Sequence, residues 1–240
     1  MSPQVRHALA GQGIDAPWRH QVEAAEAAFG GGHVALATGT ASGKTLAYLL
    51  PLLQRLRHNR SARALCVAPT TELAIQILRV AERYRDPSVG AAPLISQANR
   101  RRQAARLQRS TQLIVGTPER VVEAYLGRRL KGVGLVVLDE PEPILASPAA
   151  RELGESLARL EARVQEVLAG ATGGEQSGRW MRQRSGPCVL AYTSRGGSAG
   201  EPDRTLLRAP PARGRTGACV AALPPPRERA TSSGDRCSGW

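Results

Sequence analysis

Short apolar runs and longer amphipathic runs alternate along residues 19–169. The apolar runs predict five strands, at His33–Thr38, Ala64–Thr70, Ala91–Ser96, Gln112–Thr117 and Gly134–Glu140. Most of these runs are apolar at consecutive positions, which is typical of parallel strands that are covered on both faces.

The amphipathic runs predict helices between these strands. Their ranges are Arg19–Phe29, Gly43–Arg57, Glu72–Arg85, Asn99–Arg109, Pro118–Leu126 and Pro148–Leu168. The last run carries Leu153, Leu157, Leu160, Val164 and Leu168 at helical spacing, with charged residues between them. Strands that alternate with helices in this way predict an α/β fold, in which helices sandwich a parallel sheet.

The composition changes near Gly170. Of the last 71 residues, 37 are Gly, Pro, Arg or Ser, and Pro187–Thr193 is the one remaining strand candidate. Such a composition buries too little apolar surface to offset the entropy lost on ordering. We therefore expect a folded domain over 1–169, with a further strand at 187–193, and a largely disordered basic tail over 170–240.

The charge balance points to a polyanionic partner. The chain has 33 basic and 20 acidic residues and a formal net charge of +13, which favours nucleic acid. No apolar run is long enough to span a bilayer, so we expect a soluble, cytoplasmic protein without a membrane partner. The four cysteines lack the paired spacing of a zinc site, and Cys66 is expected to be a buried, inert thiol.

The segment Thr38–Thr45 (T-G-T-A-S-G-K-T) lies between the first predicted strand and the helix that follows it. A small-residue loop in this place binds phosphate through backbone N–H groups and the positive end of the helix, and a lysine reaches the outer phosphates. Lys44 stands at that lysine's position, and it is one of only two lysines in the chain. We therefore expect the nucleotide to contact Thr38, Gly39, Thr40, Ala41, Ser42, Gly43, Lys44 and Thr45.

A phosphate loop also needs carboxylates that hold Mg²⁺ and orient water. The apolar strand before Asp139 ends in the pair Asp139-Glu140. We expect Asp139 to hold the metal, partly through water, together with the hydroxyl of Thr45. Glu140 would act as the general base toward the water that attacks the γ-phosphate.

The chain resembles the superfamily 2 helicases, most closely the DEAD-box type of ATP-dependent RNA helicase. Four further segments carry the resemblance: the glutamine motif at Gly13–Gln21, a PTRELA-like segment at Pro69–Ala74, a TPGR-like segment at Thr117–Arg120, and Asp139–Glu142 at the D-E-A-D position. The resemblance implies a RecA-like P-loop NTPase fold that binds Mg-ATP, with Gln21 reading adenine. It also implies that a single-stranded RNA backbone contacts Pro69, Thr70, Glu72, Thr117, Pro118 and Arg120.

The chain departs from the family pattern at several positions. Thr71 replaces an Arg, Glu119 replaces a Gly, Glu142 replaces the final residue of the D-E-A-D motif, and the S-A-T motif has only Ala191-Tyr192-Thr193 as a candidate. No second RecA-like domain is recognisable after residue 170. Since that domain supplies arginine fingers in the family, we expect weak ATP hydrolysis and no unwinding by this chain alone. The abrupt change near Gly170 suggests a truncated or frame-shifted helicase, whose missing half a separate chain could supply.

Three alternatives stay open at this point. The chain could be a fragment of a DNA helicase of the same superfamily, or a non-catalytic nucleic-acid binder whose basic tail does the binding beside a vestigial ATP site. It could also be an unrelated P-loop ATPase, although the glutamine motif argues against that reading.

Overall fold

The computed structural model describes residues 3–14, 16, 19–29, 33–38, 43–96, 103, 105–107, 111–160, 164–171, 175–184 and 189–194. Its strands are β1 (His33–Thr38), β2 (Arg63–Val67), β3 (Gly90–Leu94), β4 (Thr111–Gly116), β5 (Val133–Asp139), β6 (Gln165–Gly170) and β7 (Val189–Ser194). All seven strands form one sheet in the order β3-β4-β2-β5-β6-β1-β7. Every neighbouring pair is parallel, so all strands end at the same edge.

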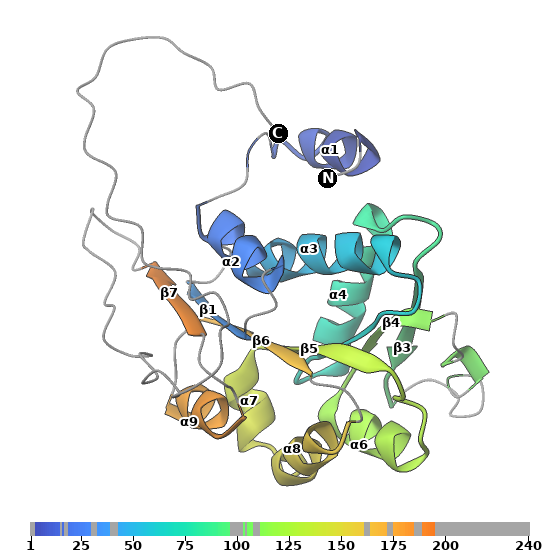
Figure 1. Ribbon diagram of the computed structural model, residues 1–240, viewed down its shortest axis with the longest axis vertical. Helices are drawn as coiled ribbons and strands as arrows, with labels where there is room; N and C mark the ends of the chain where they lie inside the picture. The colour runs from blue at the N-terminus through green and yellow to red at the C-terminus, as the bar shows by residue number, and fades with distance from the viewer. Residues whose placement is uncertain are drawn as a thin grey trace, which may run out of the picture.

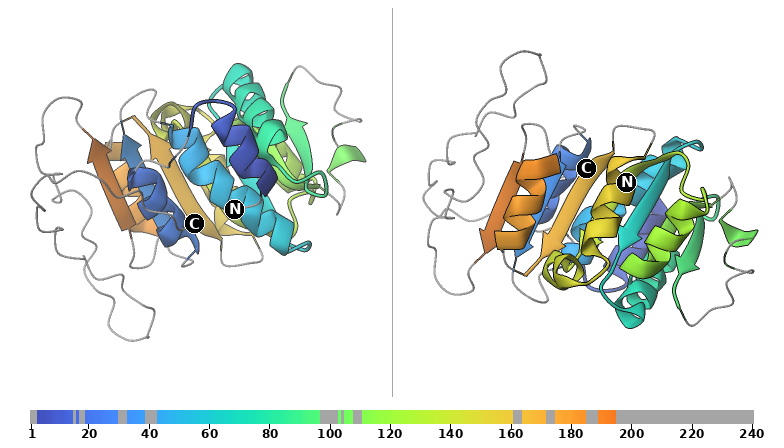
Figure 2. Two further views of the ribbon diagram at one scale, coloured as in Figure 1. Left: turned by 90° about the horizontal axis from the view of Figure 1, so that it is seen from above. Right: turned by 90° about the horizontal axis from the view of Figure 1, so that it is seen from below.

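Helices cover both faces of the sheet (Figures 1 and 2). One face carries α1 (Pro3–Ala10), α2 (Arg19–Phe29), α3 (Lys44–His58) and α4 (Thr71–Tyr84). The other carries α6 (Pro118–Leu126), α7 (Pro141–Ala146), α8 (Ala150–Ala158) and α9 (Glu175–Arg184). Each face has its own apolar core, one built around Leu49 and Val137 and the other around Leu65 and Val136. The predicted fold class, a parallel sheet sandwiched by helices, is confirmed.

Most predicted elements lie within one to three residues of their observed bounds. Strand β1 and helices α2 and α6 have the predicted ends. The weak candidate Ala91–Ser96 corresponds to β3, at an edge of the sheet. Most of the predicted helix Asn99–Arg109 lies outside the described residues.

The predicted helix Pro148–Leu168 is wrong in its second half. Helix α8 ends at Ala158, and Gln165–Gly170 forms β6, between β5 and β1. Two polar residues, Gln165 and Glu166, concealed this strand, because buried parallel strands are usually apolar throughout. Both are buried, and each has partners in neighbouring elements.

Those partners come from three helices. Gln165 accepts a hydrogen bond from Arg55 Nη1 at 2.6 Å and donates to the carbonyl oxygen of Ala28 at 2.8 Å. Glu166 accepts from Trp180 Nε1 at 2.8 Å. Since buried polar groups are tolerated where they are hydrogen-bonded, the tertiary structure makes a strand out of a segment whose spacing fits a helix.

The fold also extends past Gly170. Strand β7 pairs with β1 from His33↔Val189 to Thr38↔Ser194, which agrees with the further strand expected at 187–193. Helix α9 was not predicted; Met181 on it is buried, and Ser177 donates its backbone N–H and its hydroxyl to Glu142 Oε1. The rest of the expected tail, residues 195–240, lies outside the described residues. No helix in the described part of the chain is long and apolar enough to cross a membrane.

Candidate nucleotide site and nucleic-acid edge

The candidate site lies at the carboxyl edge of the sheet, where β1, β6 and β5 end side by side. Their last residues are in register, with Ala37 opposite Gly170 and Asp139 opposite Ala169. Ligands of open parallel sheets bind at this edge, next to strands whose connections run in opposite directions. Strand β1 leads into α3 on one face, and β5 leads into α7 on the other (Figure 1).

Lys44 is the first residue of α3. The preceding Gly43 is the N-cap residue, with φ +73° and ψ +24°, and it has no side chain that could cap the first turn of the helix. A Cβ at position 43 would lie 2.5 Å from Gln21 Nε2, so the Gln21 amide would have to move, and the positive φ by itself favours glycine. The Lys44 side chain is largely buried, and its Nζ lies 4.0 Å from Glu140 Oε1.

Gln21 on α2 reaches the end of the loop. Its Nε2 donates a hydrogen bond to the carbonyl oxygen of Gly43 at 3.1 Å. The predicted adenine-reading residue therefore touches the predicted phosphate loop. Of the other predicted loop residues, Thr38 ends β1 and Thr45 lies in the first turn of α3, whereas Gly39, Thr40, Ala41 and Ser42 lie outside the described residues.

Asp139 ends β5 and is 8% exposed. Its Oδ2 accepts a hydrogen bond from the hydroxyl of Tyr48 at 2.9 Å. Burial raises the pKa of the Asp139 carboxyl to about 6; the Tyr48 hydrogen bond and Lys44 lower it, and the charge of Glu140 raises it. A buried carboxylate whose pKa is perturbed beside two other charged groups is a candidate for a functional site.

Glu140 adopts the left-handed conformation, with φ +52° and ψ +66°. This conformation costs a non-glycine residue about 1–2 kcal/mol. Its backbone N–H donates to the carbonyl oxygen of Ala169 at 2.7 Å, which holds the turn in place. Strained backbone of this kind is concentrated at functional sites, and here it points the Glu140 carboxylate toward Lys44.

The two predicted nucleic-acid segments follow β2 and β4 at the same edge. Thr70 is exposed and caps α4, where its Oγ1 accepts from the backbone N–H of Leu73 at 3.3 Å. Pro69 is half-buried and Glu72 is exposed. The segment after β2 therefore presents polar groups to solvent.

The segment after β4 is more enclosed. Thr117, Pro118 and Arg120 are buried. The Arg120 guanidinium contacts Glu123 through Nη1 and Gln103 Oε1 through Nη2. Thr117 Oγ1 and Arg120 Nε have no hydrogen-bond partner among the residues that the structure describes. Arg120 is thus held by its own domain, whereas the resemblance implies contact with nucleic acid.

Two features of the site escaped the sequence analysis. Tyr48 looks like one more core position of α3, and only its contact with Asp139, 91 residues away, reveals a polar role. The S-A-T candidate Ala191-Tyr192-Thr193 lies on β7, on the far side of β1 from β5. Strand β6 ends at Gly170, one residue after Ala169, which lies opposite Asp139. The sequence Gly170-Ala171-Thr172 is therefore a second candidate for that motif, and it was missed because β6 was predicted as a helix.

The described residues fit a nucleotide triphosphate with a divalent cation. The open first turn of α3 and the Lys44 ammonium suit phosphate oxygens, and the Asp139 carboxylate and the Thr45 hydroxyl are the hard oxygen ligands that Mg²⁺ prefers. Tyr48 on α3 also donates to Asp139 Oδ2, so the helix and the end of β5 meet at one place.

Fold and site together define a P-loop nucleotide-binding protein built on a parallel α/β sheet. Within that class, the DEAD/DEAH box helicase family matches residues 18–177. The chain belongs to this family.

This chain matches only part of the length of each individual relative. The chain is 34% identical over 160 residues to the probable ATP-dependent RNA helicase YfmL of Bacillus subtilis, covering 65% of this chain and 42% of that protein. It is 34% identical over 165 residues to the ATP-dependent rRNA helicase RRP3 of Encephalitozoon cuniculi, covering 67% of this chain and 41% of that protein. The chain thus spans less than half the length of these curated relatives.

Solved structures show the same fold. A DEAD box protein from the hyperthermophile Methanococcus jannaschii superposes with a TM-score of 0.73 at 21% identity, covering 81% of this chain and 54% of that one. A hypothetical ATP-dependent RNA helicase from Sulfolobus tokodaii gives a TM-score of 0.71 at 21% identity, covering 81% of this chain and 57% of that one.

Proposed function

We propose that this chain is the ATP-binding domain of a DEAD-box RNA helicase, which binds Mg-ATP and the backbone of single-stranded RNA. The observation that carries the proposal is the meeting of Lys44 with the acidic pair Asp139-Glu140 at one edge of the sheet. These groups lie far apart in the chain, and a structural role alone does not require a lysine and two carboxylates at that edge.

The proposed roles follow from the chemistry of each group. Lys44 and the segment Thr38–Gly43 bind the phosphates, and Gln21 pairs with adenine through an amide that offers both donor and acceptor. Thr45 and Asp139 hold Mg²⁺, partly through water, and the cation neutralises charge on the phosphate oxygens. Glu140 takes a proton from the attacking water.

The proposed nucleic-acid contacts use the next strand ends on the same edge. Pro69, Thr70 and Glu72 follow β2, and Thr117, Pro118 and Arg120 follow β4. Hydroxyls, backbone N–H groups and an arginine suit phosphate oxygens and carry no base information. RNA is favoured over DNA because the relatives are named RNA helicases. Comparing stimulation of ATP hydrolysis by RNA and DNA strands of equal length and sequence tests this preference.

A second RecA-like domain completes the proposal. The chain covers 42% of the YfmL relative, and arginine fingers from a second domain contribute about 10³–10⁵ in rate to related phosphoryl transfers. We therefore expect slow hydrolysis by this chain alone, and faster hydrolysis when that domain is supplied in trans. A cytoplasmic location belongs to the same proposal, and cell fractionation tests it.

Replacing Lys44 tests the nucleotide site directly. In Lys44→Ala, loss of charge-assisted contacts to the phosphates should weaken nucleotide binding by about 100-fold. The measurement is a fluorescence titration with a mant-labelled ATP. Lys131→Ala is the matched control, because it removes the only other lysine, which is exposed and precedes β5 at the opposite end of that strand. Equal affinity in Lys44→Ala and Lys131→Ala would refute the site.

Glu140→Gln separates binding from hydrolysis. The amide keeps the size of the side chain but cannot accept the proton, so nucleotide affinity should persist while residual hydrolysis is lost. Phosphate release is measured beside the same titration. Unchanged hydrolysis in Glu140→Gln would remove Glu140 from the proposed mechanism.

A further inference from the structure

Tyr48 lies on α3, one turn after Lys44 and Thr45, and faces the sheet. Its side chain is buried, and its hydroxyl donates to Asp139 Oδ2 at 2.9 Å. Tyr48 therefore contacts Asp139, one of the two residues to which the proposed function assigns the metal, from the helix that also carries Thr45.

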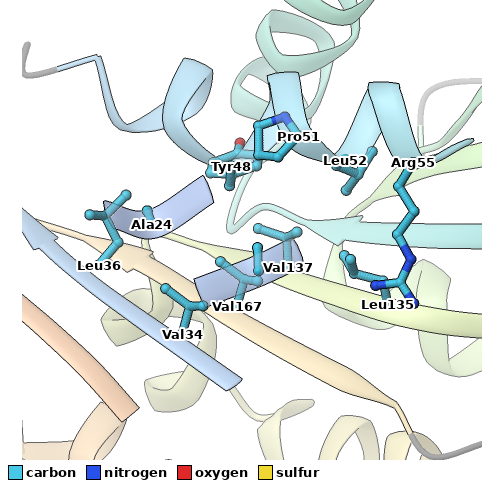
Figure 3. A pocket seen from close by; sticks show the side chains of 11 residues that line it. Ala24, Val34, Leu36, Tyr48, Pro51, Leu52, Arg55, Leu135, Val137 and Val167 are labelled. Carbon is cyan, nitrogen blue, oxygen red and sulfur yellow. The ribbon is translucent and has the colours of Figure 1, made fainter. Parts of the chain in front are cut away.

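Packing fixes the position of the Tyr48 ring. Figure 3 shows it beside Pro51 on the same helix, with Val137 and Val167 on the strands beneath. These side chains border a cavity of only about 20 Å³, which leaves the ring little room to move. The buried ring sets the place of its hydroxyl, and through it the place of the carboxylate that accepts the hydrogen bond.

We propose that Tyr48 is a positioning residue, which holds the Asp139 carboxylate in the orientation that binds the Mg²⁺ of Mg-nucleotide. The inference rests on the proposed function and names a residue through which that site is assembled. Carboxylates that bind metals are themselves hydrogen-bonded, and loss of such a partner typically costs about 10–100-fold in metal affinity. Without the hydroxyl, the buried Asp139 carboxylate would lose the side-chain donor that holds its Oδ2 and could rotate.

A purely structural role for Tyr48 needs the ring but not the hydroxyl. Every other side chain that borders the cavity, apart from Arg55, is apolar, and phenylalanine fills the same space. Tyr48→Phe therefore removes the hydrogen bond to Asp139 while it keeps the packing. Tyr84→Phe is the matched control, because Tyr84 is also a buried tyrosine but lies on α4.

The experiment measures binding of mant-labelled ATP by wild type, Tyr48→Phe and Tyr84→Phe, in EDTA and across a series of Mg²⁺ concentrations. We expect all three to bind equally in EDTA. Tyr48→Phe should need at least about tenfold more Mg²⁺ for half of the metal-dependent gain in affinity, whereas Tyr84→Phe should match wild type. Thermal melting of each variant accompanies the titrations, and Tyr48→Phe should retain a cooperative transition.

A double-substitution cycle shows whether Tyr48 acts through Asp139. In an Asp139→Asn background, Tyr48→Phe should cause no further loss of Mg²⁺ dependence. An additional loss there, an unchanged Mg²⁺ requirement in Tyr48→Phe, or an equal loss of affinity with and without Mg²⁺ would each overturn the inference. So would an unfolded Tyr48→Phe protein, because the hydroxyl would then serve the fold. If wild type itself bound no nucleotide, the proposed function would fail first.

Discussion

Arg120 shows how a single residue can serve the fold at a position that the family resemblance assigns to nucleic acid. Its side chain is 5% exposed, and its guanidinium contacts Glu123 and Gln103. The sequence identifies the TPGR-like segment but not the contact with Gln103, because Gln103 lies 17 residues earlier in the chain. In this conformation Arg120 joins the start of α6 to the segment before β4.

We expect Arg120→Ala to lower the free energy of unfolding by about 1–3 kcal/mol, because buried hydrogen bonds to a charged group are lost. For a domain of this size, each kcal/mol corresponds to about 2–4 °C in Tm. Urea unfolding followed by circular dichroism measures the change. Arg151→Ala, at an exposed arginine of α8, should stay within about 0.5 kcal/mol of wild type. Unchanged stability in Arg120→Ala would show that the contacts with Glu123 and Gln103 do not stabilise the fold.

At the scale of elements, β6 and the helices beside it depend on contacts that local sequence does not show. Trp180 on α9 donates to Glu166 on β6, and its indole packs against Gly154 on α8. A Cβ at position 154 would lie 3.2 and 3.3 Å from Trp180 Cζ3 and Cη2. The hydrogen bond to Glu166 restricts the indole, so it cannot easily move away from an added methyl group.

This contact predicts that Gly154→Ala changes the free energy of unfolding in opposite directions in the wild-type protein and in a Trp180→Phe variant. Gly→Ala inside a helix normally stabilises by about 0.5–1 kcal/mol, but Gly154→Ala should destabilise the wild-type protein because of the indole. In a Trp180→Phe background, which lacks the outer ring atoms, the same substitution should become neutral or stabilising. Denaturant unfolding of the wild type, the two single variants and the double variant gives the coupling free energy between positions 154 and 180, which we expect to be about 1 kcal/mol or more. Additive effects would show that α8 and α9 do not meet as described.

At the scale of the whole molecule, the folded unit continues beyond the point where the composition changes. Strand β7 covers the outer edge of β1, the strand that leads into the phosphate loop. Helix α9 adds the buried Met181 and the hydrogen bond to Glu166. The domain boundary expected at 169 therefore divides a sheet whose last strand ends at Ser194.

Comparing two shortened chains tests this boundary. A chain of residues 1–169 exposes the backbone edge of β1 and loses the apolar contacts of α9, whereas residues 1–194 keep both. We expect residues 1–169 to be less stable than residues 1–194 by about 3 kcal/mol or more, given the cost of losing the buried Met181 and the partly buried Trp180 side chains. Thermal melting and nucleotide titration of both chains measure this difference. Equal Tm values for the two chains would show that the stable domain ends at residue 169.

The sequence by itself determined the features that depend on neighbouring residues. Consecutive apolar residues predicted β1, β2, β4 and β5, helical spacing predicted α2, α3, α4 and α6, and the order of the motifs predicted the family. Lys44 and Asp139 could be named because their residue types stand at recognisable spacings from a strand end.

The tertiary structure alone decided the features that depend on partners far along the chain. Strand β6 carries helical spacing, and it is a strand because Arg55, Ala28 and Trp180 satisfy its buried polar groups. Glu140 holds a left-handed backbone conformation because its N–H reaches Ala169. Tyr48 gains a polar role only where α3 packs over the end of β5. A local pattern records the propensity of a segment, whereas the free energy of a buried polar group is set by the donor or acceptor that the rest of the fold brings to it.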